Sequence, residues 1–205
     1  MARVGIPHTL AYFLYYPFWK TFFEALGHQV VVSSPTTREI LDLGVEETVN
    51  DACIPIKIYH GHVASLIDKV DYMFCPRLVS VRLHGDFGSE TFCPKFLGLP
   101  DLIRLTFTKA PPIIDTRIDL KKGKKELESI CVEVGSRLGN SSQESQAACK
   151  KARQVHRQYL ALLRQGTMPP EAMEILLNGA KPASREFPPD GLSIAVVGYP
   201  YAIYD

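Results

Sequence analysis

The chain has 205 residues, the size of one domain or of one domain and a fraction at roughly 100–200 residues per domain. Its 23 Lys and Arg against 22 Asp and Glu leave a formal charge of +1, so no net field favours nucleic acid or an anionic membrane as a partner. No apolar run reaches the ~20 residues of a membrane span, and the first residues lack the long apolar stretch of a secretory signal. The sequence therefore predicts a cytoplasmic globular protein that contacts neither membrane nor nucleic acid.

The first half of the chain alternates between strand-like and helix-like patterns. Runs of aliphatic and β-branched residues predict strands, and apolar residues at helical spacing predict helices. In chain order the sequence predicts a strand over 3–7, a helix over 12–26, a strand over 28–33, a helix from Thr36 to Gly44, a helix over 54–69, a strand over 70–74 and an irregular or partly extended stretch over 99–108. Strand–helix–strand at this spacing is typical of a parallel sheet with right-handed crossovers. The predicted fold class is therefore α/β.

Individual proline, glycine and threonine residues indicate where these helices begin and end. Pro17 suits the first turn of the first helix, and Gly27 suits its C-terminal end. Thr36 followed three residues later by Glu39 resembles a capping box, and Gly44 is expected to end the second helix.

The composition changes near residue 120, where a basic run leads into helical patterns. The predicted helices run over 126–138, 142–164 and 170–177, and residues 182–191 have the proline-rich composition of a linker. The predicted division is an α/β domain over 1–119, a helical segment over 120–181, a linker over 182–191 and the opening of a second α/β unit over 192–205.

The C-terminal segment repeats a pattern from the beginning of the chain. Val197-Gly198-Tyr199-Pro200 matches Val4-Gly5-Ile6-Pro7, and an aliphatic run precedes it, so a buried strand is predicted over 192–200. A strand and turn without a following helix indicate the start of a second α/β unit, completed either by a longer chain or by a partner. In the alternative interpretation this strand joins the sheet of the first domain.

Three of the five cysteines share a local pattern in which a proline and then a cation follow the thiol: Cys53-Ile54-Pro55-Ile56-Lys57, Cys75-Pro76-Arg77 and Cys93-Pro94-Lys95. None of the five forms a CxxC pair, and their odd number without an export signal argues against a disulfide framework. Each of the three falls where a strand ends or a helix begins, and ligands of open α/β sheets gather at the carboxyl ends of the strands. A helix N-terminus and a nearby cation favour the thiolate that metals require. The pattern therefore predicts that the three thiols converge on an iron–sulfur cluster with one iron left open.

Other polar residues are candidates for weaker roles around this centre. Lys57 and Arg77 are the predicted cofactor-binding cations, which would neutralise a reduced cluster or bind a phosphate-bearing substrate; solubilising surface charge is the alternative. Cys131 and Cys149 lie beside aliphatic residues on helical faces and are predicted core thiols.

The histidines and aromatic residues of the first half allow two interpretations each. His60 and His62 point about 200° apart on a helix, so they cannot share one metal; one could donate a proton, or each could be satisfied by a backbone carbonyl. His8 and Thr9 follow the first strand and occupy the crevice position where ligands bind. An aromatic group is predicted to belong to the core or to a domain interface: Tyr12, Tyr15, Tyr16 and Trp19.

Several of these motifs together resemble one family, the activase-related (DUF2229) relatives of the 2-hydroxyacyl-CoA dehydratases. The motifs are Gly5-Ile6-Pro7, the aromatic helix ending at Leu26-Gly27, the run from Cys53 to Val63, and Asp71-Tyr72. The resemblance covers about residues 1–110 and resumes at 194–205.

This resemblance implies a fold, a cofactor and partners. The fold would be flavodoxin-like or Rossmann-like, and an oxygen-sensitive 4Fe–4S cluster would be held by Cys53, Cys75 and Cys93, which implies an anaerobic setting. An ATP-dependent activase would donate electrons, and the substrate would be an acyl-CoA or another small molecule. The chain departs from the dehydratases because their second domain is represented only by 194–205, and the helices of 120–180 match no activity. No phosphate-binding glycine motif is present, so the chain is not expected to be the activase itself.

Two other functions remain open beside an iron–sulfur component of the dehydratase type. A non-enzymatic adaptor or regulatory domain would dock a partner through its aromatic surface, and its cysteines would stay apart. A structural zinc site would combine the three thiolates with a histidine such as His62 or His84.

Overall fold

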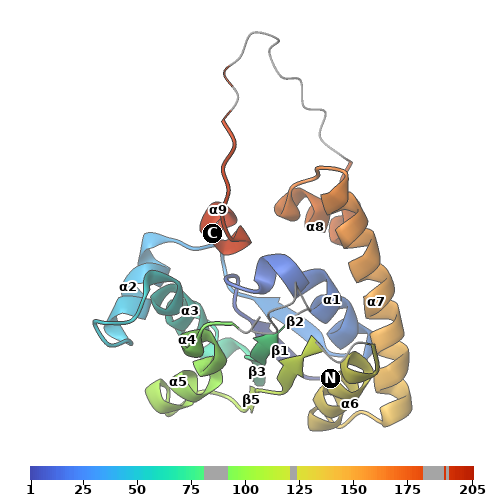
Figure 1. The fold of residues 1–205 in the computed structure, drawn as a ribbon. Coiled ribbons are helices and arrows are strands. Elements are labelled where there is room, and N and C mark those ends of the chain that lie inside the picture. Colours follow the sequence, from blue (N-terminus) through green and yellow to red (C-terminus); the bar gives the residue numbers. More distant parts are fainter. Residues whose placement is uncertain (81–91, 121–123, 182–191, 193) are drawn as a thin grey trace.

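The structure is a computed structural model that describes residues 1–80, 92–120, 124–181, 192 and 194–205. Its main sheet has four parallel strands in the order β2-β1-β3-β5 (Figure 1). The strands are β1 (Arg3–Ile6), β2 (Gln29–Val32), β3 (Tyr72–Phe74) and β5 (Ile113–Ile114). The chain passes from β1 to β2 on one side and then returns to β3 on the other side of β1. This order confirms the predicted α/β class and is consistent with a flavodoxin-like or Rossmann-like fold.

A second ladder continues two of these strands beyond the sheet. β4 (Arg77–Ser80) follows β3 after Cys75-Pro76, β6 (Arg117–Asp119) follows β5, and the two pair in parallel. Between the ladders, the Cys75 amide donates to the Ile114 carbonyl oxygen at 3.1 Å. The backbone of Cys75 is thereby fixed at the carboxyl end of the main sheet.

Helices cover both faces of the main sheet. Because side chains alternate along a strand, Phe74 packs on the face covered by α1 (Tyr12–Ala25), whereas Met73 packs on the face covered by α3 (Ile54–Ala64). The long helix α7 (Ser142–Arg164) packs on the outer side of α1, as Figure 1 shows on the right of the molecule. The two resulting apolar clusters meet the sheet from opposite sides.

α1 contains Pro17 in its interior, which differs from the predicted place in the first turn. Proline has no amide hydrogen, so the Phe13 carbonyl oxygen, four residues earlier, loses its helical donor. The Tyr159 hydroxyl of α7 donates to this carbonyl oxygen at 2.6 Å. The buried hydrogen bond satisfies the carbonyl and ties α1 to α7. At the other end of α1, Gly27 has a φ of +82°, so this position favours glycine as predicted.

α2 (Arg38–Glu46) begins one residue later than its predicted capping box. Its N-cap is Thr37, whose hydroxyl accepts a hydrogen bond from the Ile40 amide at 3.3 Å. The residue three positions after the cap is therefore an isoleucine, and the box predicted for Thr36 and Glu39 is not formed.

The contact between α2 and α3 is a backbone contact at two glycines. Gly44 lies inside α2 and does not end it as predicted. A Cβ atom there would lie 1.8 Å from the Lys57 carbonyl oxygen of α3. A Cβ atom on Gly61 of α3 would lie 1.9 Å from the Ile40 carbonyl oxygen of α2. Only residues without a side chain allow this distance of approach.

The stretch predicted as irregular over 99–108 is instead a helix, α5 (Leu99–Thr106), which follows the short α4 (Pro94–Leu97). Leu99 and Ile103 are one turn apart and are buried in the cluster that includes α3. Pro100 stands in the first turn, where its missing amide hydrogen leaves no helical carbonyl oxygen without a donor.

The helical segment packs on the sheet domain as part of one core. It consists of α6 (Lys124–Arg137), α7 and α8 (Pro169–Asn178), close to the predicted ranges. Ile130, Val134 and Ala148 belong to the same buried cluster as Val4 and Phe22. Ser141 and Glu144 form a capping box at the start of α7. The predicted division at residue 120 stays a prediction.

The buried strand predicted over 192–200 is not present in the described residues. Leu192 and Val197 are 90% and 95% exposed, and residues 194–199 have no strand partner within the described parts of the chain. An aliphatic run forms a strand only when another strand satisfies its amides and carbonyls, and the segment has no such neighbour here. The chain then forms the short helix α9 (Pro200–Tyr204). The predicted linker over 182–191 lies outside the described residues.

Candidate functional site

The sheet reverses its winding direction at the carboxyl ends of β1 and β3. The loop after β1 runs from Pro7 to Leu10, and Cys75-Pro76 follows β3. In open α/β sheets, ligands bind in the crevice at such a reversal. The fold therefore places the candidate site between these two segments.

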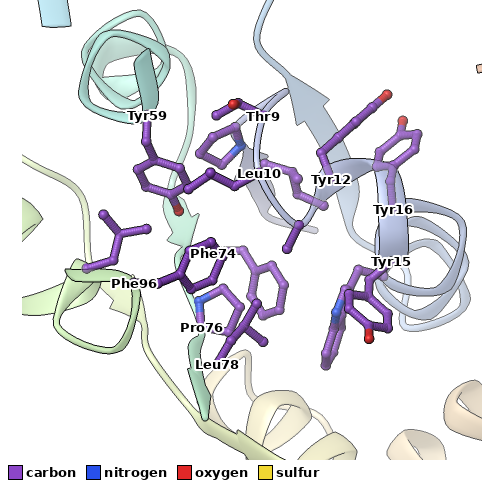
Figure 2. Close-up of a pocket in the computed structure, with 15 residues that line it drawn as sticks. Thr9, Leu10, Tyr12, Tyr15, Tyr16, Tyr59, Phe74, Pro76, Leu78 and Phe96 are labelled. Carbon is purple, nitrogen blue, oxygen red and sulfur yellow. The ribbon is translucent and has the colours of Figure 1, made fainter. Parts of the chain in front are cut away.

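An apolar pocket lies at this position (Figure 2). Side chains from β1, α1 and the segment after β3 line it together with Tyr59 of α3 and Phe96 of α4. Its volume is about 50 Å³, whereas a cavity of roughly 150 Å³ holds a benzene molecule. The pocket as it stands therefore accommodates a short aliphatic group and not a nucleotide or a ring system. Thr9 lies at its upper end in Figure 2.

The aromatic residues of α1 divide between core and pocket. Trp19 is 6% exposed and belongs to the buried cluster, which confirms the core interpretation for this residue. Tyr12, Tyr15 and Tyr16 are half-buried and line the pocket on the side of α1.

Cys53 and Cys93 are exposed N-cap residues of two neighbouring helices, α3 and α4. The Lys95 ammonium donates to the Asp51 carbonyl oxygen at 2.9 Å, which joins the two segments that carry these cysteines. Burial raises the pKa of the Tyr201 phenol of α9, and Tyr199, Cys93 and Cys53 nearby raise it further. Cys53 and Cys93 therefore lie on two joined segments, and both are near enough to Tyr201 of α9 to affect its pKa.

Cys75 differs from these two thiols because it is fully buried. Burial raises its pKa to about 12, although a hydrogen bond with the Tyr59 hydroxyl acts in the opposite direction. The Tyr59 ring belongs to the same buried cluster and lines the pocket. In this conformation Cys75 is a neutral thiol behind Tyr59.

These environments predict two classes of thiol in the native chain. With excess alkylating or disulfide reagent at about pH 8, Cys53 and Cys93 are expected to react rapidly, because they are exposed. Cys75, Cys131 and Cys149 are expected to react at least about a hundredfold more slowly, because they are buried. Peptide mapping by mass spectrometry after timed quenching measures each site separately. Rapid labelling of Cys75 in the folded chain would contradict its placement behind Tyr59.

Cys131 and Cys149 are both fully buried, which confirms the prediction of core thiols. They lie on α6 and α7, and the Cys131 thiol is hydrogen-bonded to Cys149. This contact and burial raise the pKa of Cys131.

The two predicted cofactor-binding cations, Arg77 and Lys57, have different surroundings. Arg77 donates to the Leu97 carbonyl oxygen at 2.8 Å and forms an ion pair with Asp101 at 2.8 Å. It thus holds the start of β4 against the end of α4 and the first turn of α5. Lys57 is half-buried on α3, one turn after Cys53. Their roles toward a cofactor stay predictions.

His60 and His62 are both buried on α3, with one ring nitrogen of His60 and both ring nitrogens of His62 hydrogen-bonded. The His60 Nδ1 is 2.8 Å from the Ile56 carbonyl oxygen, which is the backbone-satisfied alternative. The His62 ring lies between the Ser33 hydroxyl at 2.8 Å and the Thr36 hydroxyl at 2.9 Å. Since both ring nitrogens of His62 are engaged, it is not presented to a zinc ion in this conformation. His84, the other predicted zinc ligand, lies outside the described residues.

Some polar residues at this edge were not predicted from sequence. Asp205 at the end of α9 accepts hydrogen bonds from the hydroxyls of Thr9 and Thr36. Ser33, at the end of β2, accepts from the His8 amide at 2.9 Å. Thr9 and His8 had been predicted from their place after β1, but the sequence contains no pattern that links residue 205 to residues 9 and 36.

The comparison with protein families decides which group the chain belongs to. A family model described as the CoA enzyme activase uncharacterised domain (DUF2229) matches residues 3–205. The chain belongs to this family. The resemblance noted on the cysteine motifs is thereby confirmed and extends over the helical segment as well. No curated protein and no solved structure matches the chain. Among the helices of the described residues, none has the length and apolarity needed to cross a membrane.

The residues of this domain fit an iron–sulfur cluster in part. Cys53 and Cys93 suit it, since both thiols are exposed and stand at helix N-termini. Cys75 does not suit it as placed, because its thiol is buried and hydrogen-bonded to Tyr59. Among the described residues, no group of three His, Cys, Asp or Glu side chains is arranged to hold a metal ion. A cluster with all three cysteines requires the Tyr59 and Cys75 side chains to change rotamer.

Proposed function

We propose that this domain is the iron–sulfur-binding component of a CoA-enzyme system, with a 4Fe–4S cluster for one-electron transfer or substrate activation. Cys53, Cys75 and Cys93 are the proposed ligands. The observation that carries the proposal is that Cys53 and Cys93 are exposed N-cap residues on two segments joined by the Lys95–Asp51 hydrogen bond, while Cys75 directly follows β3. The family description, which names CoA enzyme activases, supports a place in such a system.

The surroundings of the two exposed thiols support this proposal chemically. Cys53 caps α3, an eleven-residue helix whose positive dipole end favours a thiolate. Lys95 is held two residues after Cys93, where its charge offsets that of an anionic cluster. The pocket beside Tyr59 is lined mostly by apolar side chains, so the buried side of the site is apolar. In this proposal an ATP-dependent activase supplies electrons at the exposed side, and an acyl-CoA or another small molecule is the substrate.

Anaerobic reconstitution of the full chain with ferrous iron and sulfide tests this function. The readouts are bound iron and sulfide per chain, visible absorption and the electron paramagnetic resonance of the reduced protein. Cys53→Ser, Cys75→Ser and Cys93→Ser are each expected to lower bound iron by more than about tenfold, since even changes outside the ligand set commonly weaken metal binding by roughly 10–100-fold. Cys131→Ala is the matched control, because this thiol lies in the core between α6 and α7, and it is expected to bind iron normally.

Two results would contradict the proposal in different ways. Equal iron binding by the three serine variants and the unaltered chain would exclude these cysteines as ligands. Loss of binding in Cys53→Ser and Cys93→Ser alone would leave a site that uses two of the three thiols. Circular dichroism of each variant separates loss of a ligand from loss of the fold.

A docking function is the second candidate, and one observation favours it. The described part of the segment before α9 exposes large apolar side chains, namely Leu192, Ile194, Val196, Val197 and Tyr199. Such a run in water indicates a surface that another protein unit covers. If the unaltered chain retains no iron after reconstitution, this docking function explains the structure better than the cluster does.

A further inference from the structure

The short helix α9 is held at the carboxyl edge of the sheet by its last residues. The Tyr204 ring lies 6.0 Å from the Phe13 ring, and its hydroxyl lies 3.0 Å from the Met168 sulfur. Asp205 then reaches the hydroxyls of Thr9, after β1, and Thr36, after β2. A carboxylate group is therefore bound where the loops after two adjacent strands meet.

The hydrogen bonds around this carboxylate have one consistent direction. A carboxylate only accepts, so both threonine hydroxyls donate to Asp205. The Thr36 oxygen is then free to accept from Nε2–H of His62 at 2.9 Å, and Nδ1 of the same ring accepts from the Ser33 hydroxyl at 2.8 Å. His62 is thus fixed as the neutral tautomer that carries its proton on Nε2. The network is built to present two hydroxyl donors to two carboxylate oxygens.

We infer that Thr9 and Thr36, backed by His62, form a carboxylate-binding site for a small aliphatic acid, and that Asp205 occupies this site as an intramolecular competitor. The apolar part of the acid lies in the pocket at the β1–β3 crevice. Thr9 links the two parts, because it lines the pocket and also donates to the carboxylate. The pocket volume of about 50 Å³ sets the size of the acid at a few methylene groups.

The surroundings of the site are those of a preformed binding site. Thr9 is 2% exposed with Asp205 in place, and Thr36 is half-buried. His62, which is 0% exposed, is hydrogen-bonded to Thr36 and holds its hydroxyl from the buried side. The His8 ring lies 6.4 Å from the His62 ring, and its Nδ1 is buried without a hydrogen-bond partner among the described residues. A further polar group of a ligand can therefore be satisfied beside the carboxylate.

Asp205 is suited to leave this site. It is itself exposed, and the described residues that lead to α9 from 194 to 199 are also exposed. Few buried contacts resist the release of such a segment. An acid that binds to Thr9 and Thr36 displaces Asp205 and frees the surface over Cys53 and Cys93, where Tyr201 lies.

Sodium butyrate is the probe for this site, and the fluorescence of Trp19 is the readout. Trp19 is the single tryptophan of the chain and lines the pocket. Asp205→Ala removes the competitor and is expected to bind butyrate at least about tenfold more tightly than the unaltered chain. Adding Thr36→Val to Asp205→Ala is expected to weaken binding by about tenfold or more, because a hydrogen bond to a charged group is lost. Thr108→Val in the same background is the matched control, since Thr108 is exposed and remote from the site.

The same titration with n-butanol completes the test. This alcohol has an aliphatic tail like that of butyrate but no carboxylate, and it is expected to give no saturable signal. Calorimetry confirms the stoichiometry of one butyrate per chain. The inference is wrong if Asp205→Ala binds no butyrate, if butanol binds as well as butyrate, or if Thr36→Val has no effect. None of these variants touches a cysteine, so the result stands apart from that of the iron reconstitution.

Discussion

Replacing Gly44 or Gly61 with alanine is expected to destabilise the fold by at least about 3 kcal/mol. The added Cβ atom would lie 1.8 or 1.9 Å from a backbone carbonyl oxygen of the facing helix. A flexible side chain could move away, but a helical carbonyl cannot move without the helix that carries it. The α2–α3 crossing must therefore open.

Urea denaturation of the two alanine variants measures this loss. Gly27→Ala is the control, because Gly27 has a positive φ of +82° but nothing within 4 Å of the added Cβ atom. Gly27→Ala is expected to lower the free energy of unfolding by about 1–2 kcal/mol, because alanine is strained at a positive φ. If the alanine variants at 44 and 61 unfold at the same urea concentration as Gly27→Ala, the close backbone contact does not exist.

Lowering the pH from about 7 to about 4 is expected to remove on the order of 3 kcal/mol of stability through His62 alone. Burial lowers the pKa of His62 from 6.5 to about 4, and His8 nearby lowers it further, while Asp205 acts in the opposite direction. The unfolded chain takes up a proton near pH 6.5, whereas the folded chain resists it until about pH 4. Stability is therefore full above the unfolded value and is lost as the pH falls through this window.

Other buried histidines act in the same direction. Burial also lowers the pKa of His8, His60 and His156. Free energies of unfolding from urea titrations across this pH range give the total slope, and His62→Gln isolates one contribution. The glutamine variant is expected to be less stable near neutral pH, because the Ser33 and Thr36 hydrogen bonds are disturbed, but to lose less stability on acidification. An unchanged slope in His62→Gln would contradict the burial of a neutral ring.

Helices with strong local signals were predicted closely from sequence. The range 142–164 matches α7, because Ser141 and Glu144 form the capping box that defines its start. α1 was predicted from its aromatic spacing, but the interior place of Pro17 was not. That place depends on Tyr159, a residue more than 140 positions later, whose hydroxyl replaces the missing donor.

The wrong predictions concern features that depend on a neighbouring element. Gly44 has the local pattern of a helix end, and only the facing backbone of α3 explains it as an interior residue. The run over 192–200 has the composition of a buried strand, yet composition does not reveal whether a partner strand is present. α5 was missed because its eight residues give too short a pattern beside Pro100.

The parts of the candidate site that lie at strand ends and helix starts could be predicted from the sequence. Cys53, Cys75 and Cys93 do lie at a strand end or at helix starts, as expected. The difference in burial among them was not predictable, because it is set by Tyr59 on another element. The contact of Asp205 with Thr9 and Thr36 joins residues 196 and 169 positions apart and leaves no local signal.

The position of Cys75 between β3 and β4 affects the order in which the thiols of the domain oxidise in air. Two backbone hydrogen bonds hold the chain around Cys75. The Cys75 amide donates to the Ile114 carbonyl oxygen, and the Arg77 amide donates to the Thr116 carbonyl oxygen at 3.1 Å. The Cys75 sulfur is buried and hydrogen-bonded to Tyr59 in this conformation, so oxidants reach the exposed Cys53 and Cys93 first. Of the three proposed ligands, Cys75 behind Tyr59 therefore stays reduced longest, whereas Cys53 and Cys93 are oxidised first.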